Sequence, residues 1–486
     1  MKSSIKSLTK QTLVYGVGTI MARLVTFMLL PLYTNVMPAA DYGLVALVFA
    51  FLGFMNHVYN YGLDSSVMRY YGSAETDTER REVYSSAIWM TLGSSFILSL
   101  LVYGLSHPLS RLLLSDPAYD DLLRYSAVIL FFDCICRVPF ALLRMEERPM
   151  LFMAIRLFNV IVTLALNIWF VAVLRMGVDG IFKSTVITSA VTAVLLYAFT
   201  AWKIRPTLRW STARELLIFG LPFVPTGLAT AAMEMLNRYL VEHYLDLTAV
   251  GVFSAGFKLG IFMLLIVTAF YYAWQPFFLK AGKQESSRPL FARILTYFVL
   301  VTLGFWLLLT LLMHEIVYLR IAGFALIGRA EYRACEPIVP LILLGYVFFG
   351  INQVFLPGIY FEKKTRWLAT LTILAAGVNI GANMALIPVW GIVGSALASL
   401  IGYLFLAGST LIVSQRLFRV PYEYGRIALL FGITLAVGLP VYFWTIPLGW
   451  RLIMIAIFPL LLRGLGFFRP EEIATLRVRW RGIISR

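Results

Sequence analysis

The chain has 486 residues, of which 60% are hydrophobic and only 14% are charged, and its formal net charge is +16. Soluble domains carry about 25% charged residues, so this composition excludes an ordinary soluble domain. Apolar runs of about 20 residues, the length of a spanning helix, recur along the whole sequence. They predict an all-α polytopic membrane protein, because the alternating segments that a membrane β-barrel needs are not found.

Fourteen transmembrane helices are predicted from these runs, and the short loops between them favour antiparallel neighbours in a compact bundle. In chain order the predicted helices are residues 12–36, 42–62, 84–106, 122–144, 150–173, 178–202, 214–242, 248–279, 289–313, 336–358, 366–387, 391–413, 424–445 and 450–468. The first run follows a basic head, as in a signal peptide. It is nevertheless long enough to span, and we expect it to be the first helix.

Lysine and arginine are unevenly distributed over the intervening loops. If the N-terminus is cytoplasmic, 27 of the 41 basic residues fall in cytoplasmic loops and tails, and six fall in outer loops. Cytoplasmic loops carry an excess of these residues, so we expect both termini to be cytoplasmic. Most of the net charge follows from this bias, and anionic lipid at the inner leaflet complements it. We therefore expect no nucleic-acid partner.

Two halves of the chain resemble each other. Tyr119 and Tyr332 precede the fourth and tenth predicted helices and are 213 residues apart, while Gly177 and Gly391 open the sixth and twelfth and are 214 apart. Six helices is an even number, so both copies enter the membrane in the same direction. The pattern predicts two parallel, pseudo-symmetric six-helix lobes, plus two C-terminal helices.

The predicted domains are an N-terminal lobe over residues 1–210, a C-terminal lobe over 211–415, and helices 13 and 14 with a basic cytoplasmic tail over 416–486. Internal repeats of this kind are typical of transporters, whose binding site lies between the repeats near the membrane midplane. A merely structural duplication is the alternative.

Basic residues inside the predicted helices are the main indication of function. We expect six of them to line a path for a pyrophosphate or an anionic glycan: Arg23, Arg137, Arg156, Lys183, Arg238 and Lys258. A cation at the bilayer centre costs at least about 2.5–3.5 kcal/mol, a cost usually met by water, a partner or a ligand. Most of the six lie in the first lobe. Arginine is well suited to phosphate groups.

Acidic residues accompany two of these cations. Asp133 precedes Arg137 by four residues, and Glu234 precedes Arg238 by four, so each pair shares one helix face. Each is either a neutralised pair that eases insertion or part of a wetted wall. With all six cations charged, these two carboxylates would leave a surplus of four positive charges.

Polar stripes continue along two helices at three- and four-residue steps. Asn56, Asn60 and Asp64 form one, and Arg156, Asn159, Thr163 and Asn167 form the other. Such stripes either join helices through hydrogen bonds or face a lumen; the asparagines Asn56, Asn60, Asn159 and Asn167 are our candidates for a polar lumen. The carboxylates Asp64, Asp133 and Glu234 are the candidates for ion coupling.

Motifs of energy-coupling and metal chemistry are not found. The sequence has no G-x-x-x-x-G-K-[ST] phosphate loop and no H-E-x-x-H zinc pair. We therefore expect a secondary transporter and not an enzyme, with no metal and no cofactor, driven by H⁺ or Na⁺ exchange or by the substrate gradient.

Several stretches resemble the polysaccharide transporter family, the Wzx-type flippase branch of the multidrug/oligosaccharidyl-lipid/polysaccharide exporter superfamily. They are "YNYGLDSSVMRYYG" at 59–72, "VGVFSAGFKLG" at 250–260, "GIYFEKKT" at 358–365 and "NIGANMALIPVWGIVGSALASLIGY" at 379–403. The resemblance covers roughly residues 5–415.

This resemblance implies a V-shaped pair of lobes that alternate access in the bacterial inner membrane. It implies an undecaprenyl-pyrophosphate-linked oligosaccharide as substrate, moved to the outer leaflet for O-antigen or exopolysaccharide synthesis. The implied cationic lumen fits Arg23, Arg137, Arg156 and Lys258. Expected partners are membrane lipids and the polymerase or glycosyltransferase machinery.

Other functions stay open from the sequence alone. Close alternatives are a lipid II flippase resembling MurJ and a multidrug/ion antiporter, although a net positive interior disfavours organic cations. A membrane glycosyltransferase or polymerase is a distant alternative, because the largest predicted outer loop, residues 314–335, is short for a catalytic site. A scaffold acting through the tail "RVRWRGIISR" at 477–486 is a further one.

Overall fold

The computed structural model describes residues 27–321, 323–364 and 366–469. Arg23, the beginning of the predicted first helix and the basic tail from residue 470 onward lie outside these described residues.

The first half of the chain forms helices joined by short connections. They are Phe27–Val36, α2 (Ala39–Asn60), α3 (Leu63–Ser73), α4 (Asp77–Gly104), α5 (Ser106–Leu113), the 3₁₀ turn η1 (Pro117–Tyr119), α6 (Asp120–Met145), α7 (Pro149–Asn167), the π-helix η2 (Ile168–Val173), α8 (Gly177–Thr200) and the 3₁₀ turn η3 (Ala201–Lys203).

The second half repeats this plan and then adds two longer helices joined through a short one. Its elements are α9 (Trp210–Gly220), α10 (Phe223–Ala231), the π-helix η4 (Ala232–Leu236), α11 (Asn237–Tyr244), α12 (Leu247–Leu259), α13 (Ile261–Ala281), α14 (Ser287–Leu311), α15 (Met313–Val317), β1 (Arg320–Ile321), β2 (Phe324–Ala325), the 3₁₀ helix η5 (Ala330–Ile338), α16 (Val339–Val354), α17 (Pro357–Phe361), α18 (Arg366–Leu417), α19 (Tyr424–Gly438), α20 (Pro440–Phe443) and α21 (Leu448–Gly464).

Within the described residues, ten helices are long and apolar enough to cross a membrane, or eleven if the pair α9 and α10–α11, bent by 47°, is one span. The helical membrane fold predicted from the sequence is confirmed. The predicted count of fourteen is compatible with this set, because α18 holds two predicted spans on either side of a kink at Gly391. The antiparallel pair β1–β2 is a two-residue hairpin that was not predicted.

Two predicted helices are interrupted: residues 214–242 bend between α9 and α10, and residues 248–279 break at Gly260. The apolar pattern over 248–279 continues through Gly260, but the structure ends α12 at Leu259 and begins α13 at Ile261. A side chain at Gly260 would lie 2.6 Å from Ile342 Cγ2 on α16, so the glycine lets the break pack closely there. Hydrophobicity alone cannot reveal such a break, because both sides of it are equally apolar.

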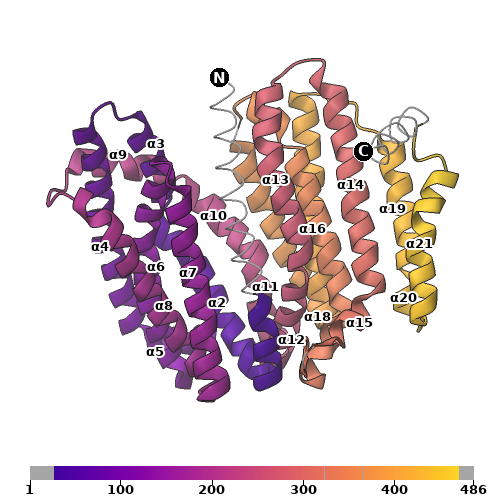
Figure 1. Cartoon of the computed structure of the whole chain (residues 1–486), viewed down its shortest axis with the longest axis horizontal. Coiled ribbons are helices and arrows are strands. Elements are labelled where there is room, and N and C mark those ends of the chain that lie inside the picture. The colour runs from indigo at the N-terminus through magenta and orange to yellow at the C-terminus, as the bar shows by residue number, and fades with distance from the viewer. Residues whose placement is uncertain (1–26, 322, 365, 470–486) are drawn as a thin grey trace, which may run out of the picture.

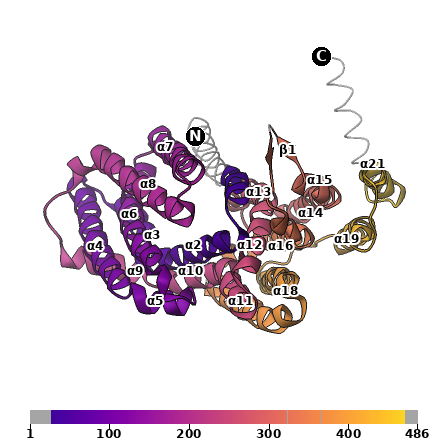
Figure 2. The same cartoon turned by 90° about the horizontal axis from the view of Figure 1, so that it is seen from below.

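Two groups of helices stand side by side in Figure 1, with α3–α8 on one side and α13–α21 on the other. Figure 2 shows α2, α10 and α12 between them. The repeat assigns α9 to the second lobe, yet α9 packs on α3 and α4: Ser66 Oγ donates to the Leu216 carbonyl at 2.8 Å. The bend after α9 carries the chain back to the second group.

The repeat is also visible in the backbone. Gly177 and Gly391 both have a positive φ, of 60° and 56°. Glu147 and Lys363, which follow the fourth and tenth predicted helices, both have φ of 53°. Left-handed residues are rare outside glycine, so matching positions support a duplicated structure.

Contacts between loops separate the molecule into two ends. Lys203 pairs with Glu146, and Lys283 pairs with Glu362, so loops predicted to be cytoplasmic meet at one end, which we call the basic end. Arg451 pairs with Glu315 at 2.9 Å among loops predicted to be outer, which form the opposite end. In Figure 1 the opposite end carries α5, α12 and α15.

Candidate substrate cavity

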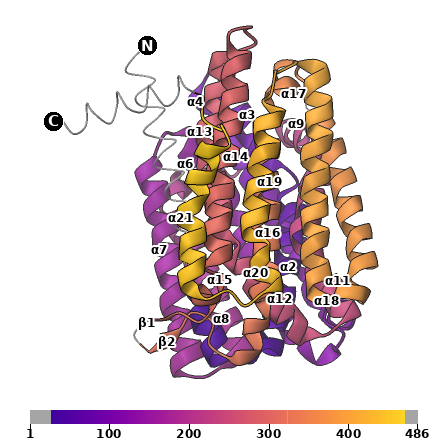
Figure 3. The ribbon, with the colours of Figure 1, turned by 90° about the vertical axis from the view of Figure 1, so that its right-hand side faces the viewer.

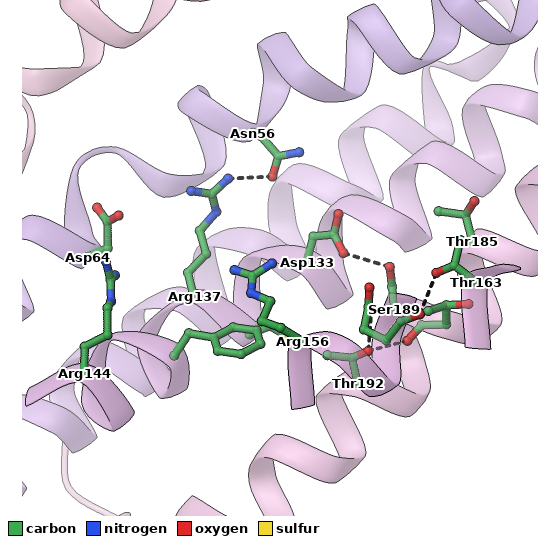
Figure 4. Close-up of a pocket in the computed structure, with 14 residues that line it drawn as sticks. Asn56, Asp64, Asp133, Arg137, Arg144, Arg156, Thr163, Thr185, Ser189 and Thr192 are labelled. Carbon is green, nitrogen blue, oxygen red and sulfur yellow. Dashed lines mark hydrogen bonds between the residues drawn. The ribbon is translucent and has the colours of Figure 1, made fainter. Parts of the chain in front are cut away.

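A cavity of about 390 Å³ lies inside the first lobe, between α2, α3, α6, α7 and α8 (Figure 4). We call it the first-lobe cavity. It is lined by Asn56, Asp64, Asp133, Cys136, Arg137, Phe140, Arg144, Arg156, Asn159, Thr163, Thr185, Thr188, Ser189 and Thr192.

Two of the predicted cations point into this cavity from neighbouring helices. The Arg137 guanidinium on α6 donates to Asn56 Oδ1 at 3.0 Å. The Arg156 guanidinium on α7 lies over the Phe140 ring, 4.2 Å from its centroid. Each group therefore keeps several N–H donors for a ligand, because a guanidinium carries five.

Asp133 does not pair with its helical neighbour. Its carboxylate accepts a hydrogen bond from Ser189 Oγ at 2.7 Å (Figure 4), and among the described residues no salt bridge joins it to Arg137 or Arg156. Of the two interpretations of this i,i+4 pair, the geometry favours the wetted wall, since Asp133 and Arg137 turn to different polar partners on α8 and α2.

Cations outnumber carboxylates in the first-lobe cavity. Arg137, Arg144 and Arg156 face Asp64 and Asp133, which leaves one positive charge in excess. The Nε of Arg144 is buried and has no hydrogen-bond partner. Buried donors are usually paired, so a missing partner here is consistent with a ligand that accepts hydrogen bonds.

Helical spacing explains the lining residues on α6 and α8. Asp133, Arg137, Phe140 and Arg144 recur every three or four residues and so share one face of α6. The hydroxyls of α8 do the same, and they were missed in the sequence because Ser and Thr commonly join membrane helices. Their regular steps at 185, 188, 189 and 192 are the signal that could have found them.

A second cavity, of about 340 Å³, lies where the two lobes meet. We call it the interlobe cavity. Arg238 and Lys258 line it together with Tyr42 and Ser254, against otherwise apolar walls. Arg238 Nη1 donates to the backbone carbonyl of Glu234 at 2.8 Å, one turn earlier in the helix.

The other predicted site residues lie elsewhere. Lys183 lines neither cavity; its ammonium lies 3.2 Å from Asp179, near the start of α8, and its side chain is 36% exposed. Asn60 donates to Asp64 Oδ1 at 3.0 Å and so orients a carboxylate of the first-lobe cavity. Arg23 is outside the described residues.

Asn167 belongs to a buried network and not to a cavity wall. Its side chain accepts a hydrogen bond from the Tyr33 hydroxyl at 2.7 Å and donates to Ser184 Oγ at 2.8 Å. In the second lobe, Asn383 donates to Asn237 Oδ1 at 2.9 Å. The two lobes thus use asparagine at comparable places to join three helices.

No candidate metal site is found among the described residues. The described residues contain no group of three or more His, Cys, Asp or Glu that could hold a metal ion. Cys134, Cys136 and Cys335 are buried and unbridged.

The duplicated lobes define a fold class, the two-lobed bundles of membrane helices, and solved structures share this fold. A structure described as lipid II flippase MurJ in an inward closed conformation has a TM-score of 0.75 and 15% identity, covering 97% of this chain and 100% of that one. An inward-facing multidrug resistance MATE family transporter of the MOP superfamily has a TM-score of 0.68 and 14% identity, covering 85% and 99%. At these identities the likeness shows the fold alone.

The family follows from the sequence match. Residues 34–321, more than half of the chain, match the family described as "Polysaccharide biosynthesis protein", and the chain belongs to this family. It is 22% identical over 410 residues to "Lsg locus putative protein 1" of Haemophilus influenzae, covering 79% of this chain and 94% of that protein. The predicted membership of a polysaccharide biosynthesis family is confirmed. The chain is a multi-pass membrane protein.

Proposed function

We propose that this protein is a flippase for undecaprenyl-pyrophosphate-linked oligosaccharides. It would move the repeat unit of a surface polysaccharide from the inner to the outer leaflet of the bacterial inner membrane by alternating access. The observation that carries this proposal is the first-lobe cavity, where three guanidinium groups face two carboxylates. Guanidinium binds phosphate oxygens in a bidentate manner, so this surplus favours a pyrophosphate over an organic cation.

The rest of the lining supports a sugar-bearing cargo. Asn159, Thr163, Thr185, Thr188 and Thr192 present amides and hydroxyls that can exchange hydrogen bonds with saccharide hydroxyls. The lipid tail would stay in the bilayer while the head group crosses along the cavities. This division lets a polar head pass without exposing it to acyl chains, where each unsatisfied polar group is costly.

The proposed orientation places the basic end in the cytoplasm. Both termini would then be cytoplasmic, as the distribution of Lys and Arg predicts. The proposed partners are the lipid-linked oligosaccharide, membrane lipids and the polymerase or glycosyltransferase machinery that makes and consumes the substrate. The proposed energy source is exchange of H⁺ or Na⁺, with Asp133, Asp64 and Glu234 as the candidate carboxylates.

A flipping assay with purified protein in liposomes tests the function. A fluorescent undecaprenyl-pyrophosphate oligosaccharide is placed in one leaflet, and its arrival in the other is read by a membrane-impermeant quencher. We expect Arg137→Ala and Arg156→Ala each to slow flipping about tenfold or more, because a charge-assisted hydrogen bond contributes about 1.5–3 kcal/mol. Lys183→Ala is the matched control, a cation in the same lobe that lines neither cavity.

Two outcomes would count against the proposal. If Arg137→Ala, Arg156→Ala and Arg23→Ala all flip the lipid at the rate of the unaltered protein, the cationic cavity is not the path. If lipid II crosses as fast as the oligosaccharide lipid, the lipid II flippase is the better description.

A further inference from the structure

A third cavity lies at the opposite end of the molecule, where α14 and α15 meet η5 and the segment from α20 to α21. Figure 3 shows α15, α20 and the β1–β2 hairpin together at this end. The cavity has a volume of about 450 Å³. We call it the end cavity. One of its walls consists of α20, the loop that follows it and Arg451 at the start of α21. These elements belong to the C-terminal addition, which the six-helix repeat leaves without a role.

Two buried polar atoms of its lining have no partner. Thr310 is only 3% exposed, and its Oγ1 makes no hydrogen bond; the Nε of Arg333 is likewise buried and unpartnered. Buried polar atoms are paired in the large majority of cases, because an unpaired one costs about 1–3 kcal/mol. The Arg333 Nε can therefore donate a hydrogen bond to a ligand in this cavity, and the Thr310 hydroxyl can donate or accept one.

The charges around the end cavity balance. Arg451 lines it and is neutralised by Glu315 at 2.9 Å, while Arg333 and Glu336 contribute one charge of each sign. His314 Nδ1 lies 3.2 Å from Glu336 Oε1. A phosphate group would find no surplus of positive charge here, in contrast to the first-lobe cavity. The ligand that fits is neutral, with several hydroxyls.

Aromatic side chains form the rim. Phe443 is 75% exposed and Trp444 is 67% exposed, and both line the cavity. Tyr442 is held beside them by its hydroxyl, which donates to the Pro337 carbonyl at 3.2 Å. These aromatic rings can stack on a ligand whose ring faces carry C–H groups. The neighbouring carboxylate, guanidinium and hydroxyl groups can bind hydroxyls at the edge of the same ligand.

We propose that the end cavity is a saccharide-binding site that receives neutral sugar residues of the transported oligosaccharide on the side where it is released. This inference rests on the proposed function for the origin of the sugar. Trp444 would stack on a sugar ring, while Thr310, Arg333 and Glu336 would bind its hydroxyls. The site would hold the head group at the outer surface after it has left the first-lobe cavity, which disfavours its return.

The test uses the full-length protein in lipid nanodiscs on an array of lipid-free neutral di-, tri- and tetrasaccharides. We expect saturable binding to at least one glycan, weakened about tenfold by Trp444→Ala and by Thr310→Val. Trp450→Ala is the matched control, because Trp450 is 63% exposed at the same end but does not line the cavity. Arg137→Ala should bind the glycan normally even if it no longer flips the lipid, which separates this site from the proposed function.

Three results would overturn the inference. The first is an unaltered protein that binds no glycan on the array. The second is binding that Trp444→Ala and Thr310→Val leave unchanged while both variants remain folded. The third is displacement of the glycan by soluble glycerol phosphate, which would identify the site as one for lipid head groups.

Discussion

Gly43 on α2 and Gly251 on α12 pack reciprocally across the two lobes. A Cβ added at Gly43 would lie 1.9 Å from the carbonyl oxygen of Leu247, and one added at Gly251 would lie 1.9 Å from the carbonyl oxygen of Ala39. Gly43 and Gly251 are 208 residues apart, and so are Ala39 and Leu247, whose carbonyl groups they contact. The internal repeat therefore places the same contact on both sides. Glycine is required at both positions because the backbones touch there.

Substitution of these glycines should separate the lobes at the opposite end. We expect Gly43→Ala and Gly251→Ala each to widen the distance between spin labels at Leu112 and Phe324, because the methyl group cannot fit against a carbonyl. Both label positions are well exposed, at 77% and 60%. The measurement is double electron–electron resonance in a background without the three buried native cysteines.

A matched control is available on α4. Gly93 has no atom within 4 Å of an added Cβ, so Gly93→Ala should leave the distance distribution unchanged. An unaltered distribution in Gly43→Ala and Gly251→Ala would show that this contact does not hold the lobes together.

Glu331 should strengthen the same contact between the lobes from the second lobe. Its Oε1 accepts a hydrogen bond from the Ala39 N–H at 2.8 Å, at the start of α2, where Pro38 provides no side-chain cap. Capping interactions contribute about 0.5–2 kcal/mol. We expect Glu331→Ala to raise the population with long Leu112–Phe324 distances. Glu75→Ala is the control at the basic end and should leave this population unchanged. Equal effects of the two variants would contradict the capping role of Glu331.

The glycine at the Gly391 kink should be costly to replace. Its φ of 56° with ψ of −135° disfavours any L side chain, so Gly391→Ala should lower stability by about 1–3 kcal/mol. Gly377→Ala on the same helix is the control, because an added Cβ there meets nothing within 4 Å. Thermal unfolding of the two variants in detergent measures the difference, and equal midpoints would rule out a strain at Gly391.

A pH-dependent contribution is expected at the basic end. The hydrogen bond and charge of Lys283 lower the pKa of the Glu362 carboxyl below its ordinary value. A lowered carboxyl pKa stabilises the folded state above the pKa of the unfolded chain, and this contribution disappears as the pH falls through the lowered value. Glu362→Gln should therefore lower the unfolding midpoint slightly at pH 7. The two proteins should converge below a pH of about 4, and a difference of equal size at both pH values would contradict this.

The sequence predicts the membrane fold well because burial in lipid imposes long apolar helices. It also places Asp133 and Arg137 on one face of α6, since helical spacing alone determines this. It did not show that Lys183 pairs with Asp179 near a helix end, because charge and depth in a span do not reveal a neighbour's rotamer.

Cavities formed between segments that are distant in the chain could not be predicted from the sequence. Thr310, Arg333 and Trp444 are separated by up to 134 residues, and no local pattern joins them. The break at Gly260 was not predicted for a related reason. Close packing against α16 determines it, and hydrophobicity does not.

The location of the pyrophosphate tests the central claim most directly. A cryo-electron microscopy structure of the protein with a lipid-linked oligosaccharide should show phosphate oxygens within about 2.7–2.9 Å of the Arg137 and Arg156 guanidinium groups. A diphosphate bound instead at Arg238 and Lys258 in the interlobe cavity, or outside both cavities, would contradict the account.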